Sequence, residues 1–309
     1  MKIVITGALG HIGSKLLRDL PKIFPGCRIV MIDNLMTQRY CSLFNLPKYG
    51  KYKFIEGDIT KINLYPYLKN STHVIHLAAI TDAASSFGKE KEIMKNNYCG
   101  TKKVASICKK TKSRFLLISS TSVYGTQKSL VAEDCGEDEL KPQSPYAFCK
   151  LKEEKLIRKL CREGLQASIF RFGTIFGISP GIRFHTAVNK FCWQAAHQQP
   201  ITVWRTALHQ KRPYLSITDA VRAIVFFINN RIPNGNTYNV VTTNYSVFEI
   251  LREIKKHLKK IQISFVSNKI MNQLSYEVSN QKIQNSGFRF KGKIGREIKK
   301  TLALFKPYK

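Results

Sequence analysis

Two side chains capable of acid–base chemistry, Tyr146 and Lys150, lie four residues apart in SPYAFCK (144–150). On a helix, this spacing places both side chains on one face. The ammonium favours the phenolate form, so the tyrosine can act as a base near neutral pH. The same interval to a lysine follows four other tyrosines: Tyr49, Tyr65, Tyr98 and Tyr124. The spacing therefore needs support from the surrounding sequence.

A cluster of hydroxyl side chains in LISSTSVYG (117–125) gives part of that support. The cluster ends an apolar run that predicts a strand, and SPYAFCK begins a predicted helix about twenty residues later. A strand-end hydroxyl, a tyrosine and a lysine one helical turn further on make a proton-transfer unit. Among the five Tyr/Lys pairs, only the pair in SPYAFCK follows such a strand end.

The glycine-rich stretch TGALGHIG (6–13) joins a predicted strand at 2–6 to a predicted helix at 11–20. Gly7, Gly10 and Gly13 allow a tight turn and a close approach of a pyrophosphate to backbone N–H groups at the start of the helix. A lone glycine triplet is a weak signal. Here it has the strand and the helix that a dinucleotide site requires.

Polar and small residues at the ends of the next strands fit the same site. Asp33 closes a predicted strand at 28–33, where a carboxylate binds the adenosine ribose hydroxyls. It would repel a 2′-phosphate, which favours NAD over NADP. Asp58 in GDI (57–59) is placed to bond the adenine amino group, and HLAA (76–79) leaves room for the cofactor.

Strand and helix patterns alternate through the first half of the chain. Further strands are predicted at 53–58, 73–79, 114–120 and 167–172, with helices at about 90–110 and 146–162. This alternation predicts an α/β fold with a parallel sheet covered on both faces. The near-continuous apolar strands agree with burial on both sides.

The alternation of strand and helix patterns ends after residue 172, where prolines and glycines divide the chain into shorter segments. We therefore expect a nucleotide-binding domain at 1–172 and a less regular, mostly substrate-binding domain at 173–309. Part of the segment at 213–245 is expected to return to the first domain. No internal repeat is present.

The charge is strongly positive, with 51 Lys and Arg against 20 Asp and Glu. One interpretation is a polyanionic partner such as nucleic acid. The other is a generally lysine-rich composition, which we favour because no arginine-rich or aromatic-interleaved tract stands out. In either case a positive surface attracts phosphorylated substrates.

The remaining composition predicts a cytoplasmic protein without a membrane segment. The first residues run directly into the glycine turn and do not resemble a signal peptide, and the apolar runs are too short to span a bilayer. The eight cysteines form no CxxC pair and have no zinc-like spacing, so we expect reduced thiols and no metal site.

Taken together, the chain resembles an extended short-chain dehydrogenase/reductase of the NAD-dependent epimerase/dehydratase family. The motifs that carry the resemblance run through most of the chain: TGALGHIG, MIDN, GDI, HLAA, NNYCGT, SSTSVYG, SPYAFCK, RFGTIFG and KRPYLSITD. The resemblance implies a Rossmann-like doubly wound parallel sheet with a smaller C-terminal substrate-binding domain. It also implies bound NAD, a nucleotide-sugar substrate and a homodimer.

By position, the resemblance implies a role for each matching residue. It gives the catalytic residues as Ser120, Tyr146 and Lys150. It gives the NAD contacts as Gly7, Gly10, His11, Ile12, Gly13, Asp33, Asn34, Asp58, Ile59, Leu77, Ala78, Ala79, Asn97, Tyr146 and Lys150. It gives the substrate contacts as Thr81, Thr121, Thr174, Arg183, Asn189, Val203 and Arg212. For Arg183 and Asn189, a plain surface role is an equal alternative.

Three departures narrow the activity. Sugar 4,6-dehydratases of this family carry an Asp-Glu pair just before VYG, where this chain has Thr121 and Ser122. The 3,5-epimerase/reductases place a cysteine beside the catalytic serine, and LISSTSVYG has none. RFGT places Thr174 where glucose/galactose 4-epimerases have asparagine, which resembles epimerases of uronic acids or other modified sugars.

The sequence thus predicts an NAD-dependent nucleotide-sugar epimerase that acts at C4 of a UDP-hexose or UDP-uronic acid through a 4-keto intermediate. The expected setting is the synthesis of surface-polysaccharide or lipopolysaccharide precursors. A nucleotide-sugar dehydrogenase or 4-keto reductase remains an alternative, because the same three catalytic residues serve it. An RNA-binding protein on a dehydrogenase scaffold is the alternative from another class, motivated by the charge.

Overall fold

The alternating pattern folds into one large parallel sheet, in a computed structural model that describes residues 1–125, 130–230, 234–258, 260–266 and 275–305. The strand order is β11-β7-β5-β4-β1-β2-β3, and every neighbouring pair is parallel. The strands are β1 (Lys2–Thr6), β2 (Arg28–Asp33), β3 (Lys51–Glu56), β4 (His73–His76), β5 (Arg114–Ser120), β7 (Ala167–Phe172) and β11 (Thr237–Val240). This order is that of a doubly wound, Rossmann-like sheet, so the predicted fold class is confirmed.

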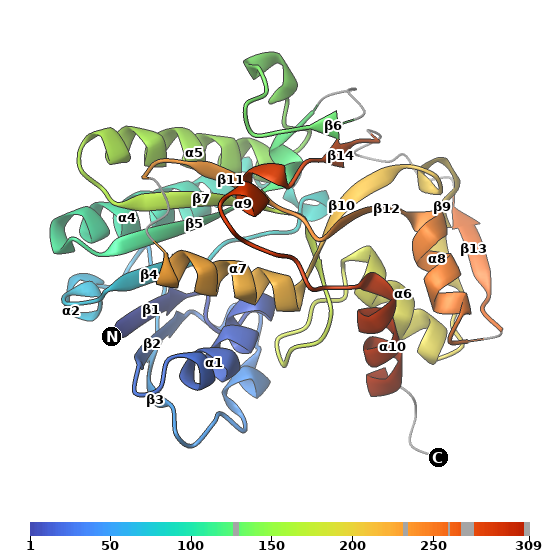
Figure 1. The fold of residues 1–309 in the computed structure, drawn as a ribbon, viewed down its shortest axis with the longest axis horizontal. Coiled ribbons are helices and arrows are strands. Elements are labelled where there is room, and N and C mark those ends of the chain that lie inside the picture. The colour runs from blue at the N-terminus through green and yellow to red at the C-terminus, as the bar shows by residue number, and fades with distance from the viewer. Residues whose placement is uncertain (126–129, 231–233, 259, 267–274, 306–309) are drawn as a thin grey trace.

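Helices cover both faces of this sheet (Figure 1). One face carries α1 (His11–Ile23) beside α7 (Ile217–Asn229), and the other carries α4 (Cys99–Thr111) beside α5 (Pro145–Arg162). Successive residues of β1 alternate between the two cores: Ile3 and Ile5 pack with α1 and α7, whereas Val4 packs with α4 and α5. The apolar run of this strand is therefore explained by burial on both faces.

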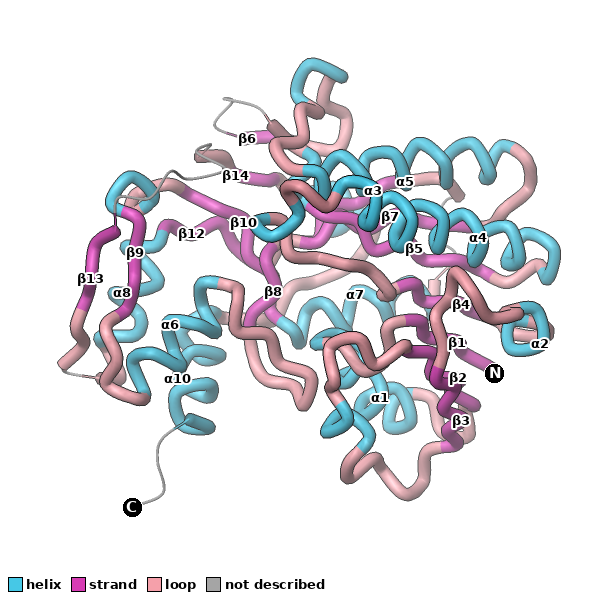
Figure 2. The backbone as a smooth tube through the Cα atoms, turned by 180° about the vertical axis from the view of Figure 1, so that it is seen from behind, coloured by secondary structure: helices cyan, strands magenta, loops and turns pink. Residues whose placement is uncertain are grey.

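The C-terminal part is built from smaller sheets (Figure 2). One sheet has the order β12-β10-β8, and β13 pairs with β9. The elements here are β8 (Thr174–Phe176), α6 (Ala187–Ala196), β9 (Ile201–Trp204), β10 (Lys211–Ser216), β12 (Thr243–Ser246), α8 (Val247–Lys255), β13 (Ile263–Val266) and α10 (Ile294–Phe305). Short elements elsewhere are α2 (Tyr65–Leu68), α3 (Glu90–Ile93), β6 (Leu130–Val131), β14 (Glu277–Val278) and α9 (Gln281–Asn285). A separate apolar core, which includes Phe176 and Ile298, lies among α6, α8 and α10.

The segment at 213–245 supplies elements to both parts of the molecule. It contains most of β10 and the start of β12, but also α7 and β11, which lie against the large sheet. Residues 231–233 of this segment lie outside the described residues. We propose that the boundary between the two domains lies at residue 172 and that α7 and β11 return to the first domain.

Some predicted element bounds differ from the structure. The strand expected at 73–79 ends at His76, because β1 beside it ends at Thr6 and the chain then turns over the glycine loop. The strand expected at 53–58 ends at Glu56, because a turn begins at Asp58, whose carbonyl accepts the N–H groups of Lys61 and Ile62. In the described part of the chain, no helix is long and apolar enough to cross a membrane.

Candidate active site

The residues predicted to do chemistry lie where the strands of the large sheet end. In parallel sheets of this order, ligands bind in the crevice outside the carboxyl ends of the strands, at the point between β1 and β4 where the strand order reverses. The glycine loop follows β1, Asp33 closes β2, and Ser120 closes β5. The sheet therefore brings together residues that are more than a hundred positions apart in sequence.

The glycine loop is shaped by close backbone contacts. Gly7 has φ +67, and a Cβ there would lie 2.6 Å from the backbone nitrogen of Ala78. A Cβ on Gly13 would lie 2.4 Å from the carbonyl oxygen of Ala8. Gly10 is less confined, since its nearest contact would be 3.3 Å away. Two of the three predicted glycines are thus required by the backbone itself.

Asp33 is tied to this loop by its carboxylate. One oxygen accepts the N–H of Leu9 at 3.0 Å, and the other accepts the N–H of Leu35 at 3.0 Å. Its neighbour Asn34 is exposed and accepts the N–H of Met36 at 3.1 Å. Each carboxylate oxygen keeps further acceptor capacity, so Asp33 can still accept from a pair of ribose hydroxyls.

His11 links the glycine loop to the segment after β8. Its Nε2 donates to the carbonyl oxygen of Gly177 at 2.8 Å, and burial lowers the pKa of His11 to about 4. The ring is therefore neutral, and Nδ1 is an acceptor with no hydrogen-bond partner within the described residues. Ser14 of the same helix accepts the N–H of Gly181 at 3.0 Å, which holds the two segments together.

The predicted asparagine, Asn97, is fully buried and bonds the backbone rather than standing free. Its Oδ1 accepts the N–H of Ile80 at 2.8 Å, and its Nδ2 donates to the carbonyl oxygen of Ile80 at 2.9 Å. Asn97 lies in a π-helical turn, Met94–Tyr98, which interrupts the helix expected at 90–110. Such turns occur often at functional sites. Here the turn fixes the segment after β4, which contains Leu77, Ala78, Ala79 and Thr81.

The expected adenine side of the site is formed by the turn after β3. Asp58 accepts bonds from the N–H and the hydroxyl of Thr60, at 2.8 and 2.7 Å. Burial alone would raise the pKa of Asp58, but these bonds and nearby lysines lower it. Ile59 is buried and packs against Gly100, whereas Ile12 lies on α1 and packs against the core beneath it. Asp58 is thus ionised and half-buried at this edge.

Ser120, Tyr146 and Lys150 come together at the end of β5. Ser144 caps α5 by accepting the N–H of Ala147 at 3.2 Å, and Pro145 occupies the first helical position. This start places Tyr146 in the first turn, where its hydroxyl is hydrogen-bonded to Ser120. The Lys150 ammonium lies 6.0 Å from the centre of the Tyr146 ring.

The electrostatics of this triad act in opposite directions. Burial raises the pKa of Tyr146, while the charges of Lys150 and Arg183 and the bond to Ser120 oppose the rise. Burial alone would lower the pKa of Lys150, but a carboxylate beside it, Glu153, raises that pKa to about 12. Lys150 is therefore a fixed cation next to the phenol.

Two buried carboxylates on α5 were not predicted from the sequence. Glu153 forms an ion pair with Lys150, with 2.8 Å between Oε2 and Nζ. Glu154 accepts two bonds from Arg171 of β7, at 2.9 and 2.8 Å, and one from the Ser119 hydroxyl at 2.7 Å. The adjacent Arg and Ser of the motifs RFGT and SSTS could have signalled this pair, since both end neighbouring strands.

The predicted substrate residues near the triad occupy different places. Thr121 is buried and donates to the carbonyl oxygen of Phe172 at 3.3 Å. Thr174 lies half-buried in β8, opposite Tyr214 of β10. Arg183 lies close enough to Tyr146 to influence its pKa, and burial lowers the pKa of Arg183 to about 10. Arg183 also contacts His185 through a ring hydrogen bond.

Asn189 is fully buried, so the alternative of a surface role is wrong for it. Its Oδ1 accepts the N–H of Gly177 at 3.1 Å, and its Nδ2 donates to the carbonyl oxygen of Arg183 at 3.0 Å. These bonds use both ends of the side-chain amide within the protein. Asn189 therefore fixes the segment that carries Arg183.

The last two predicted substrate residues lie in the C-terminal part. Arg212 is half-buried in β10, with its guanidinium 5.6 Å from the centre of the Tyr276 ring and one nitrogen donating to Gln210 at 3.1 Å. Val203 is 2% exposed and packs into the C-terminal core on β9. Its side chain thus contributes packing at this position, and Trp204 beside it is exposed.

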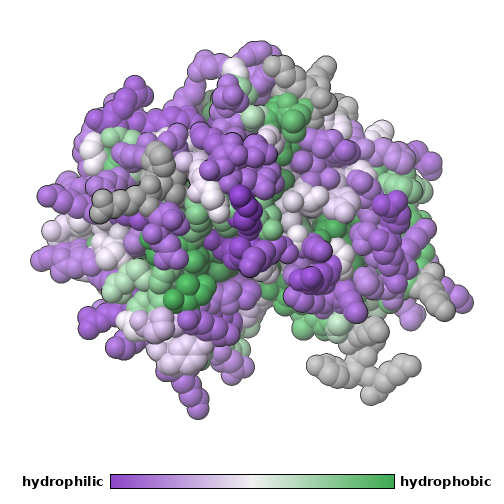
Figure 3. Space-filling view, in the orientation of Figure 1, coloured by the Kyte–Doolittle hydropathy of each residue, from purple (hydrophilic) through white to green (hydrophobic). Residues whose placement is uncertain are grey.

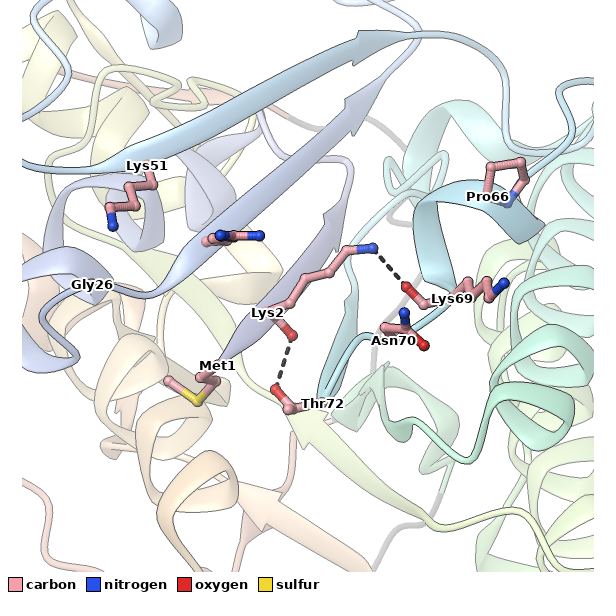
Figure 4. A pocket seen from close by; sticks show the side chains of 9 residues that line it. Met1, Lys2, Gly26, Lys51, Pro66, Lys69, Asn70 and Thr72 are labelled. Carbon is pink, nitrogen blue, oxygen red and sulfur yellow. Dashed lines mark hydrogen bonds between the residues drawn. The ribbon is translucent and has the colours of Figure 1, made fainter.

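A cavity of about 720 Å³ lies at the opposite edge of the sheet, where β1, β2 and β3 begin (Figure 4). Its lining is Met1, Lys2, Gly26, Arg28, Lys51, Pro66, Lys69, Asn70 and Thr72. The Lys2 ammonium donates to the carbonyl oxygen of Lys69 at 2.7 Å. These residues form a basic hollow without the phenol, serine and carboxylate of the triad region, so the chemistry belongs to the other edge.

Figure 3 shows that hydrophilic residues cover most of one face of the molecule.

The residues present fit a dinucleotide cofactor. The loop of Gly7 and Gly13 approaches the neighbouring backbone so closely that no side chain fits, and no side chain caps the start of α1, where N–H groups would meet a pyrophosphate. Asp33 presents a carboxylate for the ribose hydroxyls of NAD and would repel a 2′-phosphate. Within the described residues, no group of three His, Cys, Asp or Glu side chains is placed to hold a metal ion.

Comparison with known proteins agrees with this geometry. The model of the NAD dependent epimerase/dehydratase family matches residues 3–240. A trifunctional UDP-glucose 4,6-dehydratase/UDP-4-keto-6-deoxy-D-glucose 3,5-epimerase/UDP-4-keto-L-rhamnose-reductase of Arabidopsis thaliana is 31% identical over 97% of this chain and 46% of its own length. The chain thus spans about half the length of that relative.

Two further relatives cover more of their own length. An uncharacterised UDP-glucose epimerase of Bacillus subtilis is 29% identical, over 78% of this chain and 76% of its own. The crystal structure of a Tyr-to-Phe mutant of UDP-glucuronic acid 4-epimerase from Bacillus cereus, in complex with UDP-4-deoxy-4-fluoro-glucuronic acid and NAD, has a TM-score of 0.89. It is 25% identical and covers 99% of both chains.

Proposed function

Because the chain belongs to the NAD-dependent epimerase/dehydratase family, we propose that it is a nucleotide-sugar epimerase acting at C4 of a UDP-hexose or UDP-uronic acid. The observation that carries the proposal is Tyr146 of α5, held between the hydroxyl of Ser120 and the ammonium of Lys150, at the same edge of the sheet as the glycine loop. The likeness to a UDP-glucuronic acid 4-epimerase over nearly the whole chain supports it.

The residues of this chain divide the work of a reversible oxidation at the sugar carbon. NAD, when bound along the glycine loop and Asp33, supplies the two-electron acceptor for that carbon. Tyr146, as phenolate, accepts the proton of the C4 hydroxyl and returns it after the 4-keto sugar has turned over in the site. The Ser120 hydroxyl bonds the reacting oxygen, and the Lys150 ammonium favours the phenolate.

The residues before VYG favour epimerisation over dehydration. Loss of water needs an extra acid and base, and positions 121 and 122 carry hydroxyls instead. The Thr121 hydroxyl is buried and bonded to Phe172, and the Ser122 hydroxyl donates to Ser120 at 2.9 Å. Neither group is ionisable near neutral pH. The likeness to a multifunctional relative that includes a 4,6-dehydratase therefore does not extend to this activity in our proposal.

Arg183 favours an acidic sugar. It lies close to Tyr146, and the groups that influence its pKa include Tyr146, Arg39 and Asp82. A substrate carboxylate at C6 would meet this guanidinium. On this basis we place UDP-glucuronate ahead of UDP-glucose as the substrate.

The test is proton NMR of UDP-, dTDP-, CDP- and GDP-sugars, including UDP-glucuronate, with the protein and a trace of NAD. We expect a new anomeric signal without accumulation of NADH, and loss of that signal in Tyr146→Phe. Stoichiometric NADH would instead identify a dehydrogenase. Arg183→Gln should lower kcat/KM for UDP-glucuronate about tenfold or more while changing that for UDP-glucose less.

The setting of the reaction is also part of the proposal. A UDP-sugar epimerase acting in the cytoplasm would supply precursors for surface polysaccharide or lipopolysaccharide. Members of the family that resemble this chain suggest a homodimer, which light scattering at several protein concentrations would test. The positive charge would draw the anionic substrate toward the site.

A further inference from the structure

The strongest unexplained feature is a second buried ion in contact with the catalytic lysine. Glu153 lies one turn after Lys150 on α5, and its Oε2 is 2.8 Å from Nζ. The exposed fractions of the two side chains are 0% and 4%. The other oxygen, Oε1, lies 3.7 Å from Sγ of Cys149. Within the described residues, these contacts join Glu153 to Lys150 of the triad and to the residue before it.

Other charges around this pair have partners elsewhere or are neutral. Glu154, next on the helix, is committed to Arg171 and Arg158. His76 of β4 faces Lys150, but burial and that ammonium lower its pKa to about 3, so it carries no charge. Cys149 is a protonated thiol, since burial raises its pKa to about 12. Glu153 is thus the counter-ion of Lys150 inside the protein.

Arg183 is the remaining cation that faces Tyr146, from the segment after β8. The charges of Arg39 and Asp82 also influence the pKa of Arg183. Arg183 opposes the rise in the pKa of Tyr146, whereas Glu153 adds to it. The charge balance around the phenol is therefore set from two elements, α5 and the β8–α6 segment.

The charge count of the triad follows from these contacts. With Tyr146 protonated, the buried Lys150–Glu153 pair is neutral. Removing the phenolic proton then adds a second negative charge beside Glu153 in a buried site, and Arg183 offsets only part of that cost. With a neutral side chain at position 153, the same proton loss would start from a more positive site and would therefore be easier. The carboxylate of Glu153 thus opposes ionisation of Tyr146 in the free enzyme.

We propose that Glu153 is a positioning residue that holds Lys150 and keeps the proton on Tyr146 until the oxidised cofactor binds. The inference rests on the proposed function, since it assigns Tyr146 as the base. Oxidised NAD brings a positive charge to the nicotinamide end, and its reduced form does not. Binding of the oxidised form and ionisation of Tyr146 therefore strengthen one another, by linkage.

The first test measures the proton on Tyr146 directly, with no sugar present. Enzyme labelled with ¹³C at the ζ carbon of tyrosine is titrated by NMR, and the Tyr146 signal is assigned by its absence in Tyr146→Phe. In Glu153→Gln, the titration midpoint of Tyr146 should fall by about one pH unit or more. Glu153→Asp keeps the charge and should restore most of the difference. Glu163→Gln, which removes an exposed carboxylate beyond the end of α5, should leave the midpoint unchanged.

The second test uses the wild-type enzyme, so it does not depend on whether a variant folds. Titration calorimetry near pH 8, in buffers of different ionisation enthalpy, counts the protons released on binding. We expect proton release with NAD, little with NADH, and less release with NAD in Glu153→Gln. A folded Glu153→Gln with an unchanged or higher Tyr146 midpoint would overturn the proposal, as would equal proton release with NAD and NADH. Failure of every sugar to react would overturn the proposed function but would leave both readouts intact.

Discussion

Replacing Arg171 by leucine should destabilise the protein more than any surface substitution. Arg171 is 1% exposed, and its guanidinium donates to both oxygens of Glu154 and, at 2.8 Å, to the Tyr124 hydroxyl. Without it, the Glu154 carboxylate remains buried with only Arg158 and Ser119 as partners. Removing one partner of such a pair lowers the free energy of unfolding by about 3–5 kcal/mol.

Urea unfolding followed by circular dichroism would measure this loss for Arg171→Leu, Glu154→Leu and the double variant. The double variant should recover much of the stability, because two apolar side chains of similar volume leave no buried unpaired ion. Lys109→Ala provides the matched control. Its pair with Glu163 has a similar N–O distance, 2.9 Å, but is 35% and 41% exposed, so its loss should lie within about 1 kcal/mol.

The reasoning would be refuted by additivity. If the losses in Arg171→Leu and Glu154→Leu simply summed in the double variant, the two residues would not interact. A loss in Arg171→Leu as small as that in Lys109→Ala would equally show that burial does not amplify this pair. Either result would show that the Arg171–Glu154 pair does not stabilise the end of β5, where Ser119 also bonds Glu154.

Three further outcomes follow from the site. Gly13→Ala should abolish NAD binding measured by calorimetry, since its Cβ would meet backbone at 2.4 Å, whereas Gly10→Ala, with 3.3 Å to its nearest atom, should bind within about tenfold of wild type. Asn97→Ala should weaken NAD binding and lower the unfolding free energy by about 1–3 kcal/mol, because it removes the side-chain partners of the half-buried backbone of Ile80. Burial alone would raise the pKa of Glu154, but Arg171 and the other partners of the carboxylate lower that pKa overall. The stabilisation by Glu154 is therefore present above the usual carboxyl pKa and is lost as the pH falls through the lower pKa of the folded state. The difference in urea midpoint between wild type and Glu154→Gln should shrink as the solution is acidified through that range.

The sequence predicted the elements of the site better than their internal bonds. The spacing of the glycines, placed between a strand and a helix, sufficed for the loop, because Gly7 and Gly13 are required by local backbone geometry. Asp33 was predictable for the same reason, as the end of the next strand. Asn97 was predicted beside the cofactor, but the spacing gave no sign that both ends of its amide bond the backbone of Ile80.

The buried carboxylates Glu153 and Glu154 show why the ion pairs of the site could not be predicted from the sequence. In KLKEEKL (150–156), charged residues alternate so densely that periodicity does not tell which face is buried. Glu154 is buried because Arg171, on a strand paired with β5, supplies its counter-ion, and Glu153 because Lys150 does. Burial of a charge depends on a partner brought close by the tertiary fold, and such pairing is not written in local spacing.

The choice between epimerase and dehydratase rests on two positions rather than on overall similarity. A multifunctional dehydratase relative and a UDP-glucuronic acid 4-epimerase resemble the chain to a comparable degree, 31% and 25% identity, so similarity reports the scaffold that both activities share. An acidic side chain would be unfavourable at position 121. The Thr121 hydroxyl is buried and donates to the Phe172 carbonyl, and a carboxylate there would face that oxygen without a donor. The end of β5 is therefore built for hydroxyl groups, which can orient a sugar and relay no proton of their own near neutral pH. What remains for proton transfer is Tyr146, and one base that gives back the proton it takes is what a reversible epimerisation requires.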